Sequence, residues 1–205
     1  MTNKQHRALL LFGAPGVGKG TQGESLGCIP GFYHFSMGDA FRALDPNSDL
    51  GQVVASYASR GELVPDEVTI QLFWMSLESL EKQNKYHSGR DLLVLDGIPR
   101  SVRQVGLIKD RVDTLAVIHL AVTSDEAQST LVERLCKRAV EQNRADDAKD
   151  EVIRRRFEVY RAETQPILEQ CPPDLVIEID PIGTPAEVLL RVLQVVAPIQ
   201  KQLVF

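Results

Sequence analysis

Apolar residues occur in short runs that alternate with amphipathic segments along the chain. Five runs are apolar or rich in strand-forming residues, at 8–12, 33–35, 92–95, 116–120 and 175–179. Runs that are apolar at consecutive positions are typical of strands buried on both faces, as in parallel sheets with crossover helices. The pattern predicts an α/β fold with a doubly wound, five-stranded parallel sheet.

Between these runs, apolar positions recur at the spacing of amphipathic helices. We expect helices near residues 18–26, 38–44, 50–60, 66–81, 102–111, 125–139, 151–170 and 185–196. In sheets of this kind, ligands bind at the carboxyl ends of the strands. The segments after residues 12, 35 and 95 should therefore meet at one edge of the sheet, and functional side chains are expected there.

A glycine-rich segment directly follows the first apolar run. Its Gly13, Gly18 and Lys19 have the spacing of a phosphate-binding loop. Glycines let backbone N–H groups converge on an anion, and the positive end of the next helix points the same way. We expect the phosphates of a nucleotide to contact Gly13, Ala14, Pro15, Gly16, Val17, Gly18, Lys19, Gly20 and Thr21.

The hydroxyl residue of this loop comes one position later than in most phosphate loops. Gly20 follows Lys19, and the hydroxyl is that of Thr21. Mg²⁺ would then be held mostly by phosphate oxygens and waters, which suits an ion that dehydrates reluctantly. Asp96 ends the buried run 92–95 and is well placed to orient such water. We expect Mg²⁺ near Asp96 and Thr21, bound through water.

Two further motifs follow predicted strands. The run Ser-Met-Gly-Asp-Ala-Phe-Arg begins at Ser36 with the pattern of a capping box, which leaves its final residue, Arg42, unexplained. The run Asp-Gly-Ile-Pro-Arg ends at Arg100, whose planar guanidinium can bind phosphate bidentately. Gln104 lies one helical turn later, and its amide can both donate to and accept from the edge of a base.

Basic residues are concentrated between positions 134 and 161, where nine Lys or Arg stand against six Asp or Glu. Such a stretch indicates either an anionic ligand or a solvated helical face. An apolar stripe is expected along the helix 151–170, with Arg156 beside it and Arg155 opposite, so Arg156 can point inward. The stripe consists of Ile153, Phe157, Tyr160, Thr164 and Leu168.

Length and composition are those of a compact enzyme. The chain has 205 residues, 43% of them hydrophobic and 25% charged, which is enough for one core. Its net charge of −5 gives no reason to expect nucleic acid, and no apolar run reaches the roughly 20 residues of a membrane span. The three cysteines are widely separated and are expected to be reduced thiols. The start of the chain lacks the hydrophobic segment of a secretory signal, so we expect a cytoplasmic protein. We also expect a monomer.

Taken in order, these motifs resemble those of the nucleoside monophosphate kinases, and of adenylate kinases in particular, across nearly the whole chain. The Gly-Lys-Gly-Thr form of the loop is part of that likeness. The resemblance implies a P-loop NTPase-type fold and the reversible transfer of a phosphoryl group from Mg-ATP to AMP, giving two ADP. It also implies that transfer depends on positioning and charge compensation by Lys19, Arg100, Arg138, Arg144 and Arg156.

The resemblance divides the binding residues between two nucleotides. ATP would contact the phosphate loop, Arg134, Arg138 and Gly183, with Arg134 stacked on the donor adenine. Arg42 would bind the phosphate of the acceptor, and Arg100 would bridge that phosphate and the group in transfer. The AMP contacts would be Ser36, Met37, Arg42, Glu62, Leu63, Val64, Gly97, Arg100, Gln104, Arg144 and Arg156.

The same resemblance implies how a single kinase domain is organised. A core of residues 1–35, 66–137 and 151–205 would carry a monophosphate-binding segment at 36–65 and a lid at 138–150. The lid is the short kind, so no structural zinc is expected, and the pair Asp146 and Asp147 would help to hold it closed.

Two positions depart from the family pattern and leave the acceptor base open. Met37 stands where adenylate kinases usually have a threonine, and Glu62 where many relatives have a lysine. A UMP/CMP kinase is therefore an alternative, although Gln104 favours AMP because pyrimidine kinases typically have an asparagine there. A nucleotide-binding sensor without catalysis is a third hypothesis, disfavoured by the complete set of phosphate-directed residues.

Overall fold

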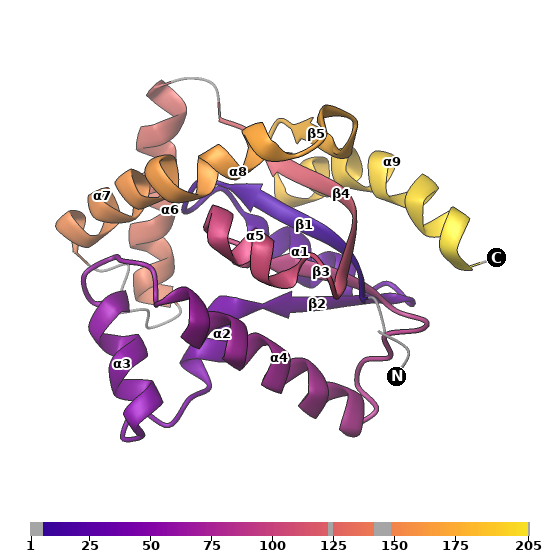
Figure 1. Cartoon of the computed structure of the whole chain (residues 1–205). Helices are drawn as coiled ribbons and strands as arrows, with labels where there is room; N and C mark the ends of the chain where they lie inside the picture. The colour runs from indigo at the N-terminus through magenta and orange to yellow at the C-terminus, as the bar shows by residue number, and fades with distance from the viewer. Residues whose placement is uncertain (1–5, 123–124, 142–148, 205) are drawn as a thin grey trace.

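A five-stranded parallel sheet forms the middle layer of the computed structural model, which describes residues 6–122, 125–141 and 149–204 (Figure 1). The strands are β1 (His6–Gly13), β2 (Phe32–Ser36), β3 (Leu92–Asp96), β4 (Val112–Leu120) and β5 (Val176–Ile179). They lie in the order β2-β3-β1-β4-β5, with every pair parallel. The predicted doubly wound, five-stranded α/β fold is confirmed.

Helices cover both faces of the sheet (Figure 1). They are α1 (Lys19–Gly27), α2 (Met37–Arg42), α3 (Asp49–Ala58), α4 (Asp66–Lys82), α5 (Val102–Ile108), α6 (Asp125–Glu141), α7 (Asp150–Val159), α8 (Gln165–Gln170) and α9 (Pro185–Val204). Among the described residues, no helix is long and apolar enough to cross a membrane.

Consecutive residues of the central strand β1 pack into different cores, which explains why its sequence is apolar at every position from 8 to 12. Leu9 belongs to a buried cluster with Leu26 of α1 and Val192 of α9. Leu10 belongs to a second cluster, with Phe73 of α4. Successive side chains of a strand point to opposite faces, so a strand covered on both sides needs apolar residues without alternation.

The helix predicted at 151–170 is interrupted. A π-helix at Tyr160–Thr164 separates α7 from α8. Pro166, in the first turn of α8, has no N–H to donate to the carbonyl four residues earlier, so the series of α-helical hydrogen bonds is interrupted beside the π-helix. The predicted stripe is buried at its first four positions, but beyond the π-helix Ile167 is buried more deeply than Leu168.

Other boundaries differ where tertiary contacts override local pattern. The helix predicted to reach 111 ends at Ile108, because the chain turns there into β4, which begins at Val112. A 3₁₀-helix, Pro173–Leu175, replaces the start of the last predicted strand. The final helix α9 continues to Val204 through Pro198.

Helix α9 packs on the core at and beyond residue 196, where its end was predicted, and this packing explains its length. Val196 is fully buried, and Ile199 packs against the same cluster. The Gln200 side chain donates to the carbonyl oxygen of Pro30 at 2.8 Å. These contacts extend the helix beyond the point where the sequence pattern predicted its end.

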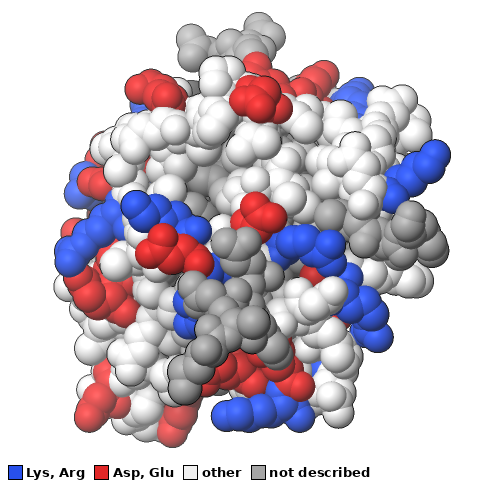
Figure 2. All heavy atoms as spheres, turned by 45° about the vertical axis from the view of Figure 1, so that its right-hand side comes forward, with Lys and Arg blue, Asp and Glu red and all other residues white. Residues whose placement is uncertain are grey.

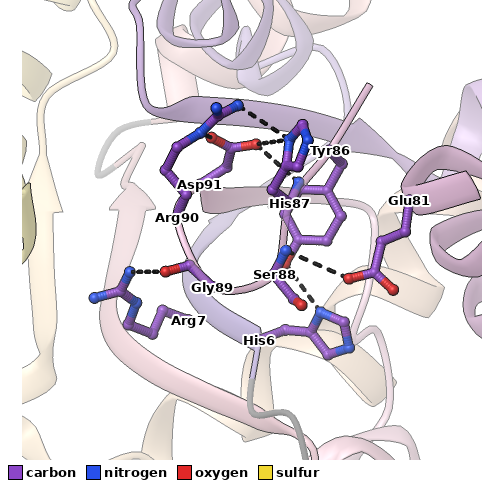
Figure 3. A network of polar contacts seen from close by, with 9 residues as sticks. All are labelled: His6, Arg7, Glu81, Tyr86, His87, Ser88, Gly89, Arg90 and Asp91. Carbon is purple, nitrogen blue, oxygen red and sulfur yellow. Dashed lines mark hydrogen bonds and ion pairs between the residues drawn. The ribbon is translucent and has the colours of Figure 1, made fainter. Parts of the chain in front are cut away.

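A network of polar contacts closes the loop between α4 and β3, at the edge where the strands begin (Figure 3). We name it the amino-edge network; it comprises His6, Arg7, Glu81, Tyr86, His87, Ser88, Gly89, Arg90 and Asp91. The hydroxyl of Tyr86 lies 2.9 Å from Nδ1 of His6. Asp91 accepts hydrogen bonds from Nε of Arg90 at 2.9 Å and from the backbone N–H of His87 at 2.8 Å. Figure 2 brings forward the side of the molecule where the strands begin, and there basic and acidic side chains are interspersed.

Candidate active site

The glycine-rich loop connects β1 to α1 at the carboxyl edge of the sheet. Gly13 and Gly16 have φ angles of +143° and +81°, which L side chains rarely adopt. A Cβ at Gly16 would also lie 2.7 Å from the carbonyl oxygen of Leu131, so α6 closes over the loop. Helix α1 begins immediately after the loop, at Lys19, and its free backbone N–H groups therefore face the space above it.

The carbonyl groups of the loop hold its lysine. Nζ of Lys19 donates to the carbonyl oxygens of Gly13 at 2.7 Å and Ala14 at 3.1 Å. Gly13 and Ala14 thus contact Lys19 rather than lining the cleft above the loop. The rest of the loop lines that cleft.

A cleft of about 1040 Å³ opens over this edge of the sheet. This volume is at the upper end of the range usual for small-molecule sites. It is lined by most of the residues predicted to bind nucleotides: Pro15, Gly16, Val17, Gly18, Lys19, Gly20, Thr21, Ser36, Met37, Arg42, Glu62, Leu63, Val64, Asp96, Gly97, Arg100, Gln104, Arg134, Arg138, Arg156 and Gly183. Arg144, Asp146 and Asp147 lie outside the described residues.

Several cationic side chains line the cleft, and their charges lower the pKa of neighbouring cations. The pKa of Lys19 is lowered to about 8, mainly by desolvation within the site; the charge of Asp96 raises it, and the charges of Arg100, Arg156 and Arg138 lower it. Like charges gathered in a poorly hydrated site destabilise each other unless an anion joins them. The arrangement is therefore that of an anion-binding site.

Arg100 is held through its backbone while its side chain remains available. Desolvation lowers the pKa of Arg100 to about 10, and the neighbouring charge of Arg156 acts in the same direction. The hydroxyl of Thr164, in the π-helix, donates to the carbonyl oxygen of Arg100 at 2.8 Å. Among the described residues, the guanidinium of Arg100 makes no hydrogen bond or ion pair. Sequence reasoning placed Thr164 in an apolar stripe and missed this contact, which joins residues 64 positions apart.

Asp96 ends β3 directly beside the loop. Its Oδ2 lies 3.6 Å from the position that a Cβ at Gly20 would occupy, and 4.0 Å from Nε2 of His34. His34 in turn fits against α1 only because position 23 is glycine, since a Cβ there would lie 2.3 Å from Nε2. His34 was not among the residues selected from the sequence. The feature that could have indicated it is its polar side chain within the run 33–35.

The start of α2 has the predicted cap. Oγ of Ser36 accepts a hydrogen bond from the backbone N–H of Asp39 at 3.2 Å. The carboxylate of Asp39 also accepts from Arg42 at 2.6 Å, in a partly exposed pair that competition from a phosphate could separate. Met37 is only 1% exposed, and a Cβ at Gly97 would lie 3.6 Å from its Cβ. The side chain that replaces the usual threonine therefore packs in the floor of the cleft.

Two other predicted acceptor contacts already have protein partners. The carboxylate of Glu62 accepts a hydrogen bond from Nε of Arg60 at 2.9 Å. Gln104 is 2% exposed, and its side-chain oxygen accepts from the backbone N–H of Arg100 at 2.7 Å. Its side-chain nitrogen donates to Asp66 at 2.8 Å, a residue that sequence reasoning did not select.

The sequence is similar to those of known proteins. A family model described as "Adenylate kinase" matches residues 11–172. The chain belongs to the adenylate kinase family. Proteins named adenylate kinase in Clavibacter michiganensis subsp. michiganensis and Mycolicibacterium smegmatis are each 37% identical to it over 191 residues. These alignments cover 90% of this chain and 90% and 96% of the relatives.

Another relative named adenylate kinase, from a Nocardioides species, is 38% identical over 195 residues, which cover 91% of this chain and 95% of that protein. The family predicted from the motifs is thus confirmed over most of the chain. The names of these relatives do not favour the UMP/CMP kinase alternative.

Proposed function

We propose that this protein catalyses the reversible transfer of the terminal phosphoryl group of ATP to AMP, giving two molecules of ADP. The observation that carries the proposal is the convergence of Lys19, Arg100, Arg138 and Arg156 on one cleft above the phosphate loop. Membership of the adenylate kinase family supports the same reaction. The protein is accordingly an ATP:AMP phosphotransferase.

The donor nucleotide would occupy the part of the cleft above the phosphate loop. Backbone N–H groups at the start of α1 and the ammonium of Lys19 would bind its β- and γ-phosphates. Arg134, by resemblance, would stack on the donor adenine, and Gly183 would lie beside the nucleotide. Both residues line the cleft, which supports this placement.

The acceptor would occupy the part of the cleft lined by α2 and the start of α5. Arg42 would leave Asp39 to bind the phosphate of AMP, and Gln104 would contact its base. Arg100 would bridge the acceptor phosphate and the group in transfer, because its guanidinium can hold two oxygens at once. Arg156 and Arg138 would offset the charge that spreads over the transferring group.

The residues beside the loop fit a hydrated Mg²⁺. Asp96 offers a carboxylate oxygen at the end of β3, and Thr21 lines the same cleft. Such hard oxygen groups suit an ion that keeps several waters. When bound, Mg²⁺ would neutralise charge on the phosphate oxygens of ATP. Asp96 would orient the waters bound to the ion.

Transfer to a nucleotide rather than to water requires a closed site. We propose that the monophosphate-binding segment 36–65 and the short lid 138–150 close over the two nucleotides, and that the lid holds no structural zinc. Residues 142–148, with Arg144, lie outside the described part, so this role rests on the family resemblance. We further propose a cytoplasmic monomer whose partners are ATP, AMP and ADP; the net charge of −5 gives no reason to expect nucleic acid.

A coupled assay with Mg-ATP and each of AMP, CMP, UMP and GMP tests the proposal. We expect ADP formation to be fastest with AMP by a wide margin. Faster turnover with UMP or CMP would instead assign a pyrimidine kinase. Tight ATP binding without transfer to any monophosphate would indicate a sensor.

A further inference from the structure

The side-chain oxygen and nitrogen of Gln104 each bond to a protein group. One of these groups can only donate a hydrogen bond and the other can only accept one. Its Oε1 accepts from the backbone N–H of Arg100, which can only donate, at 2.7 Å. Its Nε2 donates to Oδ1 of Asp66, a carboxylate that accepts, at 2.8 Å. Rotation of the amide by 180° would bring two donors together at one end and two acceptors at the other. Only one orientation of this amide is therefore stable.

Asp66 is itself held in place, at the first residue of α4. Its Oδ1 also accepts from the hydroxyl of Ser101 at 2.9 Å, and that hydroxyl accepts from the backbone N–H of Gln104 at 3.1 Å. Ser101 and Gln104 are 6% and 2% exposed. Hydrogen bonds in such a dry, closed ring are stronger than in water. The start of α4 thus fixes a side chain at the start of α5.

The remaining hydrogen-bonding capacity of Gln104 is one donor and one acceptor. A primary amide has two N–H donors and two lone pairs on oxygen, and the protein uses one of each. Gln104 lines the cleft, where a base can meet the other two. In adenine, the ring atom N1 accepts and the 6-amino group donates. In a 6-oxopurine, N1–H donates and O6 accepts, so the order is reversed.

We propose that Asp66 is a specificity-determining residue that makes the acceptor site select adenine over 6-oxopurines. It does so by locking the amide of Gln104 in the orientation that suits adenine. A freely turning amide would satisfy either base. The inference rests on the proposed role of Gln104 in reading the acceptor base.

The test compares AMP with IMP as acceptors of phosphate from Mg-ATP. IMP differs from AMP only at position 6 and in the N1 proton, so the ratio of the two kcat/KM values isolates the reading of this edge. Asp66→Ala removes one of the two partners that fix the amide and leaves the backbone N–H of Arg100, so we expect it to lower the AMP:IMP ratio about tenfold, with kcat/KM for IMP rising in absolute terms. A merely structural role would lower both values together and leave the ratio unchanged, which would overturn the proposal.

Two further variants serve as controls. Asp66→Asn keeps an acceptor oxygen for Gln104, so it should retain most of the selectivity. Glu67→Ala removes the neighbouring acid of the same helical turn, whose partner is Arg103, and should leave the ratio within about twofold of the wild type. If Asp66→Ala does not fold, Ser101→Ala removes the hydroxyl bound to Asp66 and should lower the ratio by a smaller factor; an unchanged ratio in Ser101→Ala would then count against the proposal.

Gln104→Ala distinguishes failure of this inference from failure of the proposed acceptor site. If it leaves the AMP:IMP ratio unchanged, Gln104 does not read the base and the proposed site is wrong. If it lowers the ratio while Asp66→Ala does not, the acceptor site stands and only the role of Asp66 is wrong. A lower AMP:IMP ratio in both variants supports the contact of Asp66 with Gln104 and the contact of Gln104 with the base.

Discussion

Arg90 and Arg100 lie at opposite edges of the same sheet, and their surroundings differ. At the amino edge, Nε of Arg90 bonds to Asp91 at 2.9 Å, and this partner raises the pKa of Arg90. At the carboxyl edge, desolvation and the charge of Arg156 lower the pKa of Arg100. One arginine is bonded to an acid, whereas the other lies among cations whose effect the charge of Asp96 offsets only in part.

The histidines and carboxylates show the same difference. In the amino-edge network, His6 bonds to Tyr86, and Asp91 has partners on both oxygens. At the cleft, the buried Nε2 atom of His34 has no hydrogen-bond partner among the described residues and lies 4.0 Å from Asp96. Paired polar groups stabilise the fold, whereas converging like charges destabilise it and indicate a ligand of opposite charge. We therefore propose that the paired edge serves stability and that the unbalanced edge binds the ligands.

Removing one arginine from each edge should give the largest contrast. We expect Arg100→Ala to lower kcat by about a thousandfold or more, because this guanidinium would offset charge on the transferring group. Its thermal midpoint should stay the same or rise, since a charge among like charges is lost. Arg90→Ala should keep kcat within about twofold and lower the midpoint. Steady-state kinetics and thermal melts of both proteins measure this, and near-normal kcat in Arg100→Ala would contradict the assignment.

Removing one carboxylate from each edge should give the next largest effect. Asp96→Asn should lower kcat about 10- to 100-fold, as expected for a residue that orients water on a metal ion. Asp91→Ala should leave kcat unchanged and destabilise the protein by about 2 kcal/mol, because the acceptor of hydrogen bonds from Arg90 and His87 is lost. Steady-state kinetics of the two variants measures kcat, and urea unfolding measures the free energy of unfolding. Equal losses of activity in the two variants would remove the distinction between the edges.

A single hydroxyl at the amino edge should affect stability alone. Tyr86→Phe removes the group that bonds to Nδ1 of His6 within a buried cluster. We expect a loss of about 1–3 kcal/mol in the free energy of unfolding and no change in KM for either nucleotide. His6→Phe tests whether the loss belongs to the pair, because the double variant should be less destabilised than the sum of the two single variants.

The smallest predicted effect is a proton taken up with ATP. The pKa of Lys19 is lowered to about 8, so at pH 8 roughly half of the molecules carry a neutral Lys19. Polyphosphate raises that pKa, and binding should therefore take up about half a proton. Calorimetry at pH 8 in buffers of different ionisation enthalpy measures the number of protons taken up when ATP binds. Lys19→Arg cannot lose its proton and should show none; an equal uptake in that variant would assign the proton to another group.

Sequence alone predicted the sheet and the phosphate loop because both depend on local pattern. Apolar runs such as 8–12 require burial on two faces, and the spacing of Gly13, Gly18 and Lys19 suits few ligands besides phosphate. The family resemblance predicted the arginines that line the cleft within the described residues, which are Arg42, Arg100, Arg134, Arg138 and Arg156. These signals lie within short stretches of chain, where spacing fixes geometry.

The features that sequence reasoning missed join residues far apart in the chain. Asp66 bonds to Gln104 across 38 positions, and His6 bonds to Tyr86 across 80. Such contacts depend on where two helices begin or on how a loop closes, which periodicity does not encode. The π-helix at Tyr160–Thr164 could have been predicted in part. Pro166 indicates an interruption there, but the continuous apolar stripe favoured a single helix.

The central claim is that two nucleotides meet with their phosphates head to head in one cleft at the carboxyl edge. Calorimetric titration with a compound of two adenosines joined by five phosphates tests it most directly, with ATP and AMP as competitors. We expect one molecule bound per chain, competition by both nucleotides, and much weaker binding to Arg100→Ala. Binding that ATP prevents but AMP does not affect would show that the two sites are not joined as proposed.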